Sequence, residues 1–182
     1  QSAYKSEDGG LTWTIIPGLA PGQRVPGRAP APDGGGTSPM VMTELAASPA
    51  NSNAIVAPDA VGGLYVSADR GATWAQVAPA IVIPPSTTNT VLRTFFASFD
   101  PKDGRRAFVG TSHGSLLIGT NVGTTTESWV EQPVAPAAAD GNYPWLLAMA
   151  WSGDGSKAWL TTNENGGSVY RSSDGGRSFT LV

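Results

Sequence analysis

The chain has 182 residues, enough for one domain with a sizeable core, and its 40% apolar and 14% charged residues are ordinary for a folded protein. A formal net charge of −3 without a cluster of Lys or Arg argues against nucleic acid or an anionic membrane surface as a partner. The chain has no cysteine and a single histidine, His113, which excludes a disulfide scaffold and a Cys- or His-rich zinc site. No apolar stretch is long enough to span a membrane. With no cysteine and one histidine, we expect no bound metal ion, and we expect no cofactor either.

Three segments repeat the pattern Ser-x-Asp-x-Gly-x-x-aromatic along the chain. A fourth, degenerate copy begins at Thr120, carries Asn121 in the Asp position and reaches its aromatic residue, Trp129, three residues late. The four aromatic residues lie 61, 55 and 50 residues apart, which is near the period of a four-stranded repeat unit. The defining residues of the intact copies are Ser6, Asp8, Gly10 and Trp13; Ser67, Asp69, Gly71 and Trp74; and Ser172, Asp174, Gly176 and Phe179.

Short apolar runs bounded by Pro, Asn, Asp and Gly precede the later motifs, as expected for successive antiparallel strands. No longer segment has a sustained helical apolar period, and 23 glycines and 15 prolines disfavour long helices. The sequence therefore predicts an all-β chain in which each repeat is strand, turn, strand, turn, strand, motif, strand. The strands expected before the last three motifs are 40–47, 54–58 and 64–66; 92–99, 107–111 and 116–118; and 145–151, 157–162 and 168–171.

The repeated motif is interpreted as a structural turn between the third and fourth strands. Its Asp carboxylate is expected to accept hydrogen bonds from two or three main-chain N–H groups, while the Ser hydroxyl caps the strand end. The Gly in the fifth position permits a positive φ. The closing aromatic ring is expected to cover the apolar edge toward a neighbouring repeat, which contributes roughly 2–3 kcal/mol per ring.

This motif resembles the Asp-box, or BNR repeat, of sialidases, xyloglucan-active glycoside hydrolases, sortilin-type receptors and a photosystem assembly factor. The resemblance implies a β-propeller of four-stranded blades, in which the boxes lie on the outer rim, away from the ligand face. About three and a half blades of a six- to eight-bladed propeller fit the chain: half a blade at 1–17 and full blades at 38–78, 90–133 and 143–182. Such an arc leaves two apolar blade faces open, so we expect the remaining blades to come from further sequence or from another chain.

In propellers of this kind, the channel mouth is lined by the starts of the innermost strands and the loops between second and third strands. Aligning the repeats places Arg93 and Trp145 at strand starts and Asp59, His113 and Glu164 in the loops. Arg93 could pair with a carboxylate or sugar hydroxyls, and Trp145 and Tyr143 could stack on a sugar ring. Glu44, Asp59 and Glu164 are the candidate carboxylates for acid/base chemistry. Solvated loop positions, a core Trp and a turn-capping His113 are the ordinary alternatives.

Two functions remain open at this point. The first is a non-catalytic propeller, extracellular or in the cell envelope, that binds a carbohydrate or protein ligand through its channel face. The second is a glycoside hydrolase of the xyloglucanase-like or sialidase-like kind. A sialidase-like site needs three arginines, and Arg93 is the only arginine expected at a suitable position. A xyloglucanase-like site needs two aspartates that face each other, and Asp59 and Asp140 are the only loop aspartates expected near the channel mouth. No Gly-x-Ser-x-Gly elbow or phosphate-binding loop is present.

Overall fold

The computed structural model describes residues 3–16, 44–59, 63–77, 93–137, 141–163 and 166–182. These residues form β-strands joined by turns. They contain no α-helix and therefore no helix that is long and apolar enough to cross a membrane. The strands make one two-stranded and three four-stranded sheets, all antiparallel and each in sequence order. The chain is all-β, as its sequence predicts.

The strands of each sheet follow one another along the chain. The first sheet holds β1 (Tyr4–Lys5) and β2 (Thr14–Ile15), and the second holds β3 (Ala46–Ala47), β4 (Ile55–Asp59), β5 (Gly63–Ser67) and β6 (Ala75–Gln76). The third holds β7 (Thr94–Phe99), β8 (Ala107–Thr111), β9 (Ser115–Thr120) and β10 (Ser128–Pro133). The fourth holds β11 (Leu146–Trp151), β12 (Ala158–Thr162), β13 (Val169–Ser172) and β14 (Thr180–Leu181).

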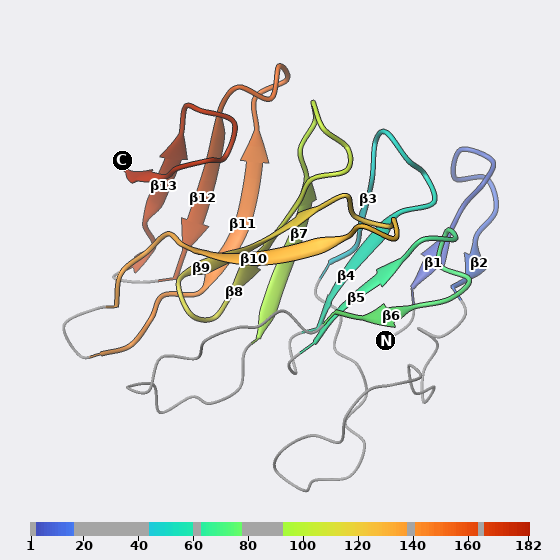
Figure 1. Cartoon of the computed structure of the whole chain (residues 1–182), viewed down its shortest axis with the longest axis horizontal. Helices are drawn as coiled ribbons and strands as arrows, with labels where there is room; N and C mark the ends of the chain where they lie inside the picture. Colours follow the sequence, from blue (N-terminus) through green and yellow to red (C-terminus); the bar gives the residue numbers. More distant parts are fainter. Residues whose placement is uncertain (1–2, 17–43, 60–62, 78–92, 138–140, 164–165) are drawn as a thin grey trace, which may run out of the picture.

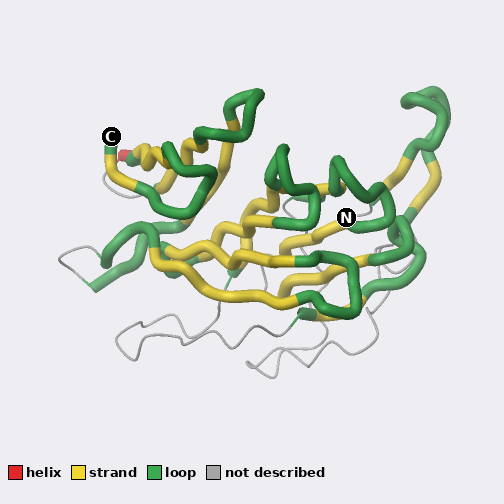
Figure 2. Tube along the Cα trace, turned by 45° about the horizontal axis from the view of Figure 1, so that its top comes forward, coloured by secondary structure: helices red, strands yellow, loops and turns green. Residues whose placement is uncertain are grey.

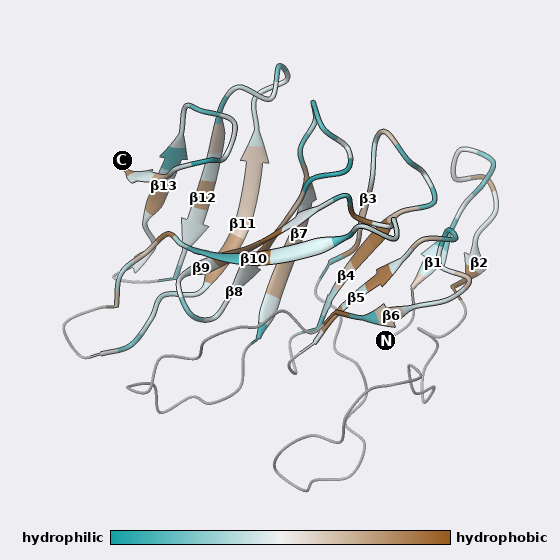
Figure 3. Ribbon diagram, viewed as in Figure 1, coloured by the Kyte–Doolittle hydropathy of each residue, from teal (hydrophilic) through white to brown (hydrophobic). Residues whose placement is uncertain are grey.

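The four sheets stand side by side in a row from the N-terminal to the C-terminal sheet (Figures 1 and 2). Hydrophobic residues concentrate on the strands, whereas the turns are mostly hydrophilic (Figure 3). Strand β8, in the middle of the third sheet, is buried along its whole length because sheets pack on both of its faces. This double coverage explains why 107–111 reads as a continuous apolar run rather than an alternating one.

Three apolar clusters join each sheet to the next one. The first joins the first and second sheets, the second joins the second and third, and the third joins the third and fourth. The buried members of the three clusters are, respectively, Ala3, Ile16, Ala57, Tyr65 and Trp74; Val56, Leu64, Val66, Ala97, Phe99, Ala107, Val109, Leu117 and Val122; and Phe96, Phe108, Leu116, Ile118, Ala135, Leu146, Leu160 and Tyr170. Burial between sheets, rather than within one, therefore supplies the core.

The three Ser-x-Asp-x-Gly turns share one hydrogen-bond pattern. In the second turn, Ser67 Oγ donates to Asp69 Oδ1 at 2.8 Å and accepts from the Gly71 N–H at 2.7 Å. The Asp69 carboxylate accepts from both the N–H and the hydroxyl of Thr73, at 2.8 and 2.6 Å. The first two turns have one further bond, in which the Trp Nε1 donates to the Gly carbonyl oxygen, at 3.2 Å for Trp74 and Gly71; Phe179 of the third turn has no such donor. The side chains thus satisfy main-chain groups that the tight turn leaves without ladder partners.

The closing aromatic residues differ in burial. Trp74 is 7% exposed, because it packs in the cluster between the first and second sheets. Phe179 packs on the cluster between the third and fourth sheets. Trp13, in contrast, is 62% exposed, since no described sheet lies against its side of the first sheet. The predicted role of the ring as a cover between repeats therefore describes Trp74 and Phe179 and not Trp13.

The degenerate fourth turn uses a different carboxylate. Glu127 Oε2 accepts from the Gly123 N–H at 2.6 Å, and its Oε1 accepts from Trp129 Nε1 at 2.8 Å. Asn121 adopts a φ of 52° and its carbonyl oxygen accepts from Thr124 N at 3.1 Å. The three additional residues before Trp129 thus bring in a glutamate that replaces the missing Asp.

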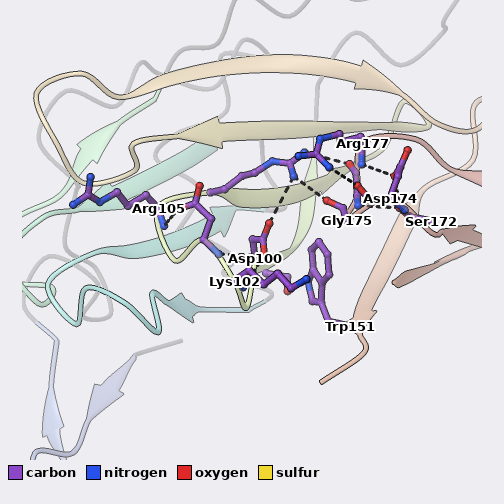
Figure 4. A network of polar contacts seen from close by, with 12 residues as sticks. Asp100, Lys102, Arg105, Trp151, Ser172, Asp174, Gly175 and Arg177 are labelled. Atoms are coloured by element: carbon purple, nitrogen blue, oxygen red, sulfur yellow. Dashed lines mark hydrogen bonds and ion pairs between the residues drawn. The ribbon is translucent and has the colours of Figure 1, made fainter. Parts of the chain in front are cut away.

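Polar contacts also connect the third and fourth sheets at the ends that carry these turns. Asp100, which follows β7, lies close to the turn at Gly175 and to Trp151 at the end of β11 (Figure 4). Trp151 Nε1 donates to Ser98 Oγ at 3.0 Å. Arg106 bridges the two sheets, because its Nη1 donates to the Gly175 carbonyl oxygen at 2.8 Å and also lies 3.6 Å from Asp100 Oδ2.

Candidate functional site

Because the strands are antiparallel, successive turns lie alternately at the two opposite ends of each sheet. The Ser-x-Asp-x-Gly turns join third and fourth strands, so they lie at one end. The starts of the innermost strands and the turns between second and third strands, including the β8–β9 turn, lie at the other end, the lower edge of Figure 1. The sequence-predicted ligand residues are expected at this second end.

Arg93 and His113 lie next to each other at this end. Ser112 N–H donates to the Arg93 carbonyl oxygen at 2.9 Å, and Arg93 N–H donates to Ser112 Oγ at 3.1 Å. Ser112 Oγ lies 3.2 Å from His113 Nδ1. The Arg93 side chain is exposed, whereas His113 is only 6% exposed and its ring centroid is 6.3 Å from that of Tyr143.

Trp145 stacks on a residue that the sequence analysis did not single out, Phe95. Their ring centroids are 5.0 Å apart with an interplanar angle of 19°. Asn163, after β12, holds the Trp145 main chain in place by accepting from its N–H through Oδ1 at 2.8 Å and donating to its carbonyl oxygen at 3.3 Å. Both rings are half-buried, so each keeps some surface open to solvent.

The structure thus brings four predicted ligand residues together and adds a fifth. We call this group the end-face cluster, and it consists of Arg93, Phe95, His113, Tyr143 and Trp145. Phe95 lies near the start of β7, where the pairing with β8 shifts register between Thr94 and Phe96, and it is half-buried between these two buried residues. The repeat pattern does not reveal this irregularity, so it gives no signal for Phe95.

The three candidate carboxylates do not form a similar group. Glu44 lies at the surface just before β3; partial desolvation of its carboxyl group raises its pKa, and a hydrogen bond from the Ala97 main chain acts in the opposite direction. Asp59 is the last residue of β4 rather than a loop residue, pairs with Gly63 and is fully buried. Its N–H donates to Thr94 Oγ1 at 2.9 Å. Glu164 and Asp140 lie outside the described residues.

A groove of about 870 Å³ begins beside the end-face cluster and follows β10. His113 and Tyr143 form its boundary with the cluster, and Trp129, Glu131 and the 133–137 segment line the remainder. Ser115 Oγ donates to Glu131 Oε1 at 2.5 Å and lies 2.8 Å from Thr111 Oγ1. We call this hollow the β10 groove. The repeat pattern does not predict the β10 groove, because the residues that line it belong to the degenerate repeat and to the connection after β10.

Among the described residues, no three His, Asp or Glu side chains lie close enough to hold a metal ion. The site offers aromatic rings, a guanidinium group and isolated carboxylates.

No protein-family model matches this sequence, and no curated protein matches it either. Solved structures do match. The GH74 xyloglucanase from Xanthomonas campestris has 19% identity and a TM-score of 0.64, covering 98% of this chain and 26% of its own. The GH74 enzyme of Niastella koreensis has 22% identity and a TM-score of 0.61, covering 99% and 25%. YCF48 from Cyanidioschyzon merolae has 15% identity and a TM-score of 0.61, covering 100% and 52%.

These similarities define the fold. The chain has the fold of β-propeller blades, as these solved structures do. It spans about a quarter of the length of the two GH74 enzymes and about half that of YCF48. At these identities, the similarity shows the fold alone.

Proposed function

We propose that this chain is part of a ligand-binding β-propeller and that it binds a glycan through the end-face cluster. The observation that carries the proposal is the Phe95–Trp145 stack, half-open to solvent, on the same end as the exposed Arg93 and the half-buried Tyr143. Aromatic rings fixed by packing offer flat apolar surfaces at little cost in conformational entropy. Such surfaces suit the apolar face of a sugar ring.

The polar part of the cluster complements this surface. The Arg93 guanidinium has five N–H donors, which can bind sugar hydroxyl groups or a carboxylate. Two hydrogen bonds hold the Arg93 main chain, one from the Ser112 N–H and one to the Ser112 hydroxyl, so the Arg93 side chain extends from a fixed backbone position. A few oriented polar groups beside aromatic side chains are the usual composition of a small-ligand site.

A glycoside hydrolase is the second candidate function, and Glu44 favours it. A carboxyl group whose pKa is raised by burial suits a general acid, and the pKa of Glu44 is raised in this way. Three of the solved structures that match are GH74 enzymes, one of them a xyloglucanase. Hydrolysis needs a second carboxylate across the substrate. Asp59 is buried, which is why the binding function is proposed first.

We further propose that the complete propeller contains blades beyond those described. Large apolar side chains are exposed on the outermost sheets, among them Tyr4 at 55% and Trp13 at 62% on the first sheet and Val169 at 41% on the last. Additional blades, from further sequence or from another chain, would cover them. An extracellular or cell-envelope location is proposed with the glycan ligand, since structural polysaccharides are found there.

A panel of glycans tests these functions directly. The protein is incubated with xyloglucan, other plant β-glucans and sialylated glycans, and both retention of the protein and released reducing sugar are recorded. Retention without release supports the binding function, and release of sugar supports the hydrolase. A protein that is neither retained by any glycan nor active on one would disprove glycan recognition and favour a protein ligand.

A further inference from the structure

Strand β10 is an unusual outer strand. It has six residues, whereas the outer strands of the other sheets, β2, β6 and β14, have two each. Very short edge strands are one way in which proteins avoid pairing with other chains. In the described part of the chain, β10 pairs with β9 alone, so its second edge carries a long row of main-chain groups.

The register of the sheet identifies the groups that point outward. Val134 N–H donates to the Gly114 carbonyl oxygen at 2.9 Å, which makes these two residues a hydrogen-bonded pair. Bonded and non-bonded pairs alternate along an antiparallel ladder. Ser128, Val130 and Gln132 therefore bond to β9, and the N–H and C=O groups of Trp129 and Glu131 point toward the open edge.

The side chains along this edge add a charge. Trp129 and Glu131 line the β10 groove on the same face of the strand, two residues apart. The Glu131 carboxylate is held by the Ser115 hydroxyl, which in turn contacts Thr111 Oγ1. None of the ion pairs among the described residues involves Glu131. The edge thus presents main-chain donors and acceptors next to an oriented negative charge.

We propose that β10 binds an extended peptide segment of another protein as an added strand, with a Lys or Arg side chain opposite Glu131. Main-chain hydrogen bonds supply affinity in this mode, and alternate side chains supply specificity. A glycan has no regular series of N–H and C=O groups to match Trp129 and Glu131, so it fits this edge less well. The proposal goes beyond glycan binding at the end-face cluster and does not depend on it.

The first test uses the peptide acetyl-Val-Thr-Val-Lys-Val-Thr-Val-amide and two N-methylated isomers of it. One isomer is methylated at the second and fourth residues and the other at the third and fifth. Because alternate N–H groups of an added strand face β10, one isomer should lose about tenfold or more in affinity and the other should bind like the parent. Absence of binding, or equal effects of the two isomers, would overturn the proposal.

The second test addresses Glu131. Glu131→Gln should weaken binding of the parent peptide about tenfold, since it removes a charge-assisted contact. The matched control is Glu7→Gln, at the far end of the row of sheets, which should bind like the wild type. Amide hydrogen exchange should show that the peptide protects Trp129 and Glu131. If Glu131→Gln and Glu7→Gln bind the peptide with equal affinity, the proposed contact of Glu131 is wrong. If the molecular mass of the protein doubles with concentration in the absence of peptide, the edge of β10 pairs with a second copy of the chain instead.

Discussion

The guanidinium group of Arg106 donates a hydrogen bond to the carbonyl oxygen of Gly175, 69 residues later in the chain, at 2.8 Å. The same side chain lies over the Phe108 ring, 4.5 Å from its centroid, and near the Asp100 carboxylate. Burial lowers the pKa of Arg106, and the charge of Asp100 acts in the opposite direction. Arg106 therefore fastens the Ser-x-Asp-x-Gly turn of the fourth sheet to the third sheet.

Arg106→Ala should lower the free energy of unfolding by about 1–3 kcal/mol, because it leaves the largely buried Asp100 carboxylate and a turn carbonyl without this donor. Chemical denaturation measures the change. Arg105→Ala, which removes a neighbouring guanidinium group outside the bridge between the sheets, is the control and should have an effect within about 0.5 kcal/mol. Equal losses in the two variants would show that the bridge contributes nothing specific.

Gly176→Ala should destabilise the same turn by about 1–3 kcal/mol. Gly176 has a φ of 76°, and an added Cβ would lie 2.9 Å from Phe108 Cζ. Gly153→Ala is the matched control, since its φ is not in the left-handed region and nothing lies within 4 Å of its added Cβ. Thermal unfolding of both variants measures the difference, and a Gly176→Ala variant as stable as Gly153→Ala would contradict the packing described here.

Glu127→Ala should cost about 1–3 kcal/mol of stability, because Gly123 N–H and Trp129 Nε1 both lose their acceptor. Glu7→Ala provides the comparison, since Glu7 makes only an exposed ion pair with Lys5. Urea titration of both variants tests whether Glu127 replaces the missing Asp of the fourth turn. A loss for Glu127→Ala no larger than for Glu7→Ala would refute that role.

Stability should fall as the pH decreases from about 4 toward 2. Hydrogen bonds from the side chain and then the main chain of Thr12 lower the pKa of Asp8 from 3.8 to about 2, and bonds led by the Thr73 and Ser178 hydroxyls lower those of Asp69 and Asp174. A carboxyl group with a lowered folded-state pKa stabilises the fold above its unfolded-state pKa and loses this effect as the pH falls through the folded-state pKa.

Denaturant midpoints measured between pH 5 and pH 2 test this dependence. Asp174→Asn should make the decline shallower, because it removes one of the carboxyl groups that take up a proton on unfolding. Ser173→Ala, next to Asp174 but without the loss of a carboxyl group, should leave the slope unchanged. Parallel slopes for the wild type and Asp174→Asn would contradict the expected contribution.

The repeat pattern predicts the order of strands well because turn chemistry and apolar runs are local signals. The motif pattern assigns no role to the hydroxyl groups of Thr12, Thr73 and Ser178, although they occupy the same position in all three copies. Their role appears only in the folded turn, where each donates to the Asp carboxylate at 2.6 Å. Glu127 could not be found by the pattern, since the three additional residues of the fourth copy displace it from the aligned positions.

The site was less predictable than the fold. Arg93 and Trp145 could be placed from strand starts, which a repeat alignment locates. The repeat alignment predicts a loop at Asp59. In the structure, β4 extends to Asp59, because its pairing with Gly63 continues the β4–β5 ladder, and the Asp59 side chain is buried. The β10 groove depends on how a six-residue outer strand and the following connection meet the β8–β9 turn. Contacts between segments that are far apart in the sequence give no local sequence pattern from which the groove could be predicted.

The most direct test of glycan binding at the end-face cluster compares two tryptophan variants. Xyloglucan oligosaccharides and, separately, the best-retained glycan of the panel are titrated calorimetrically into the wild type, Trp145→Ala and Trp13→Ala. Loss of a stacking ring should weaken binding about tenfold or more in Trp145→Ala. Trp13, exposed in a turn at the opposite end of the sheets, should be dispensable. Unchanged affinity in Trp145→Ala, or equal loss in both variants, would contradict the proposed site.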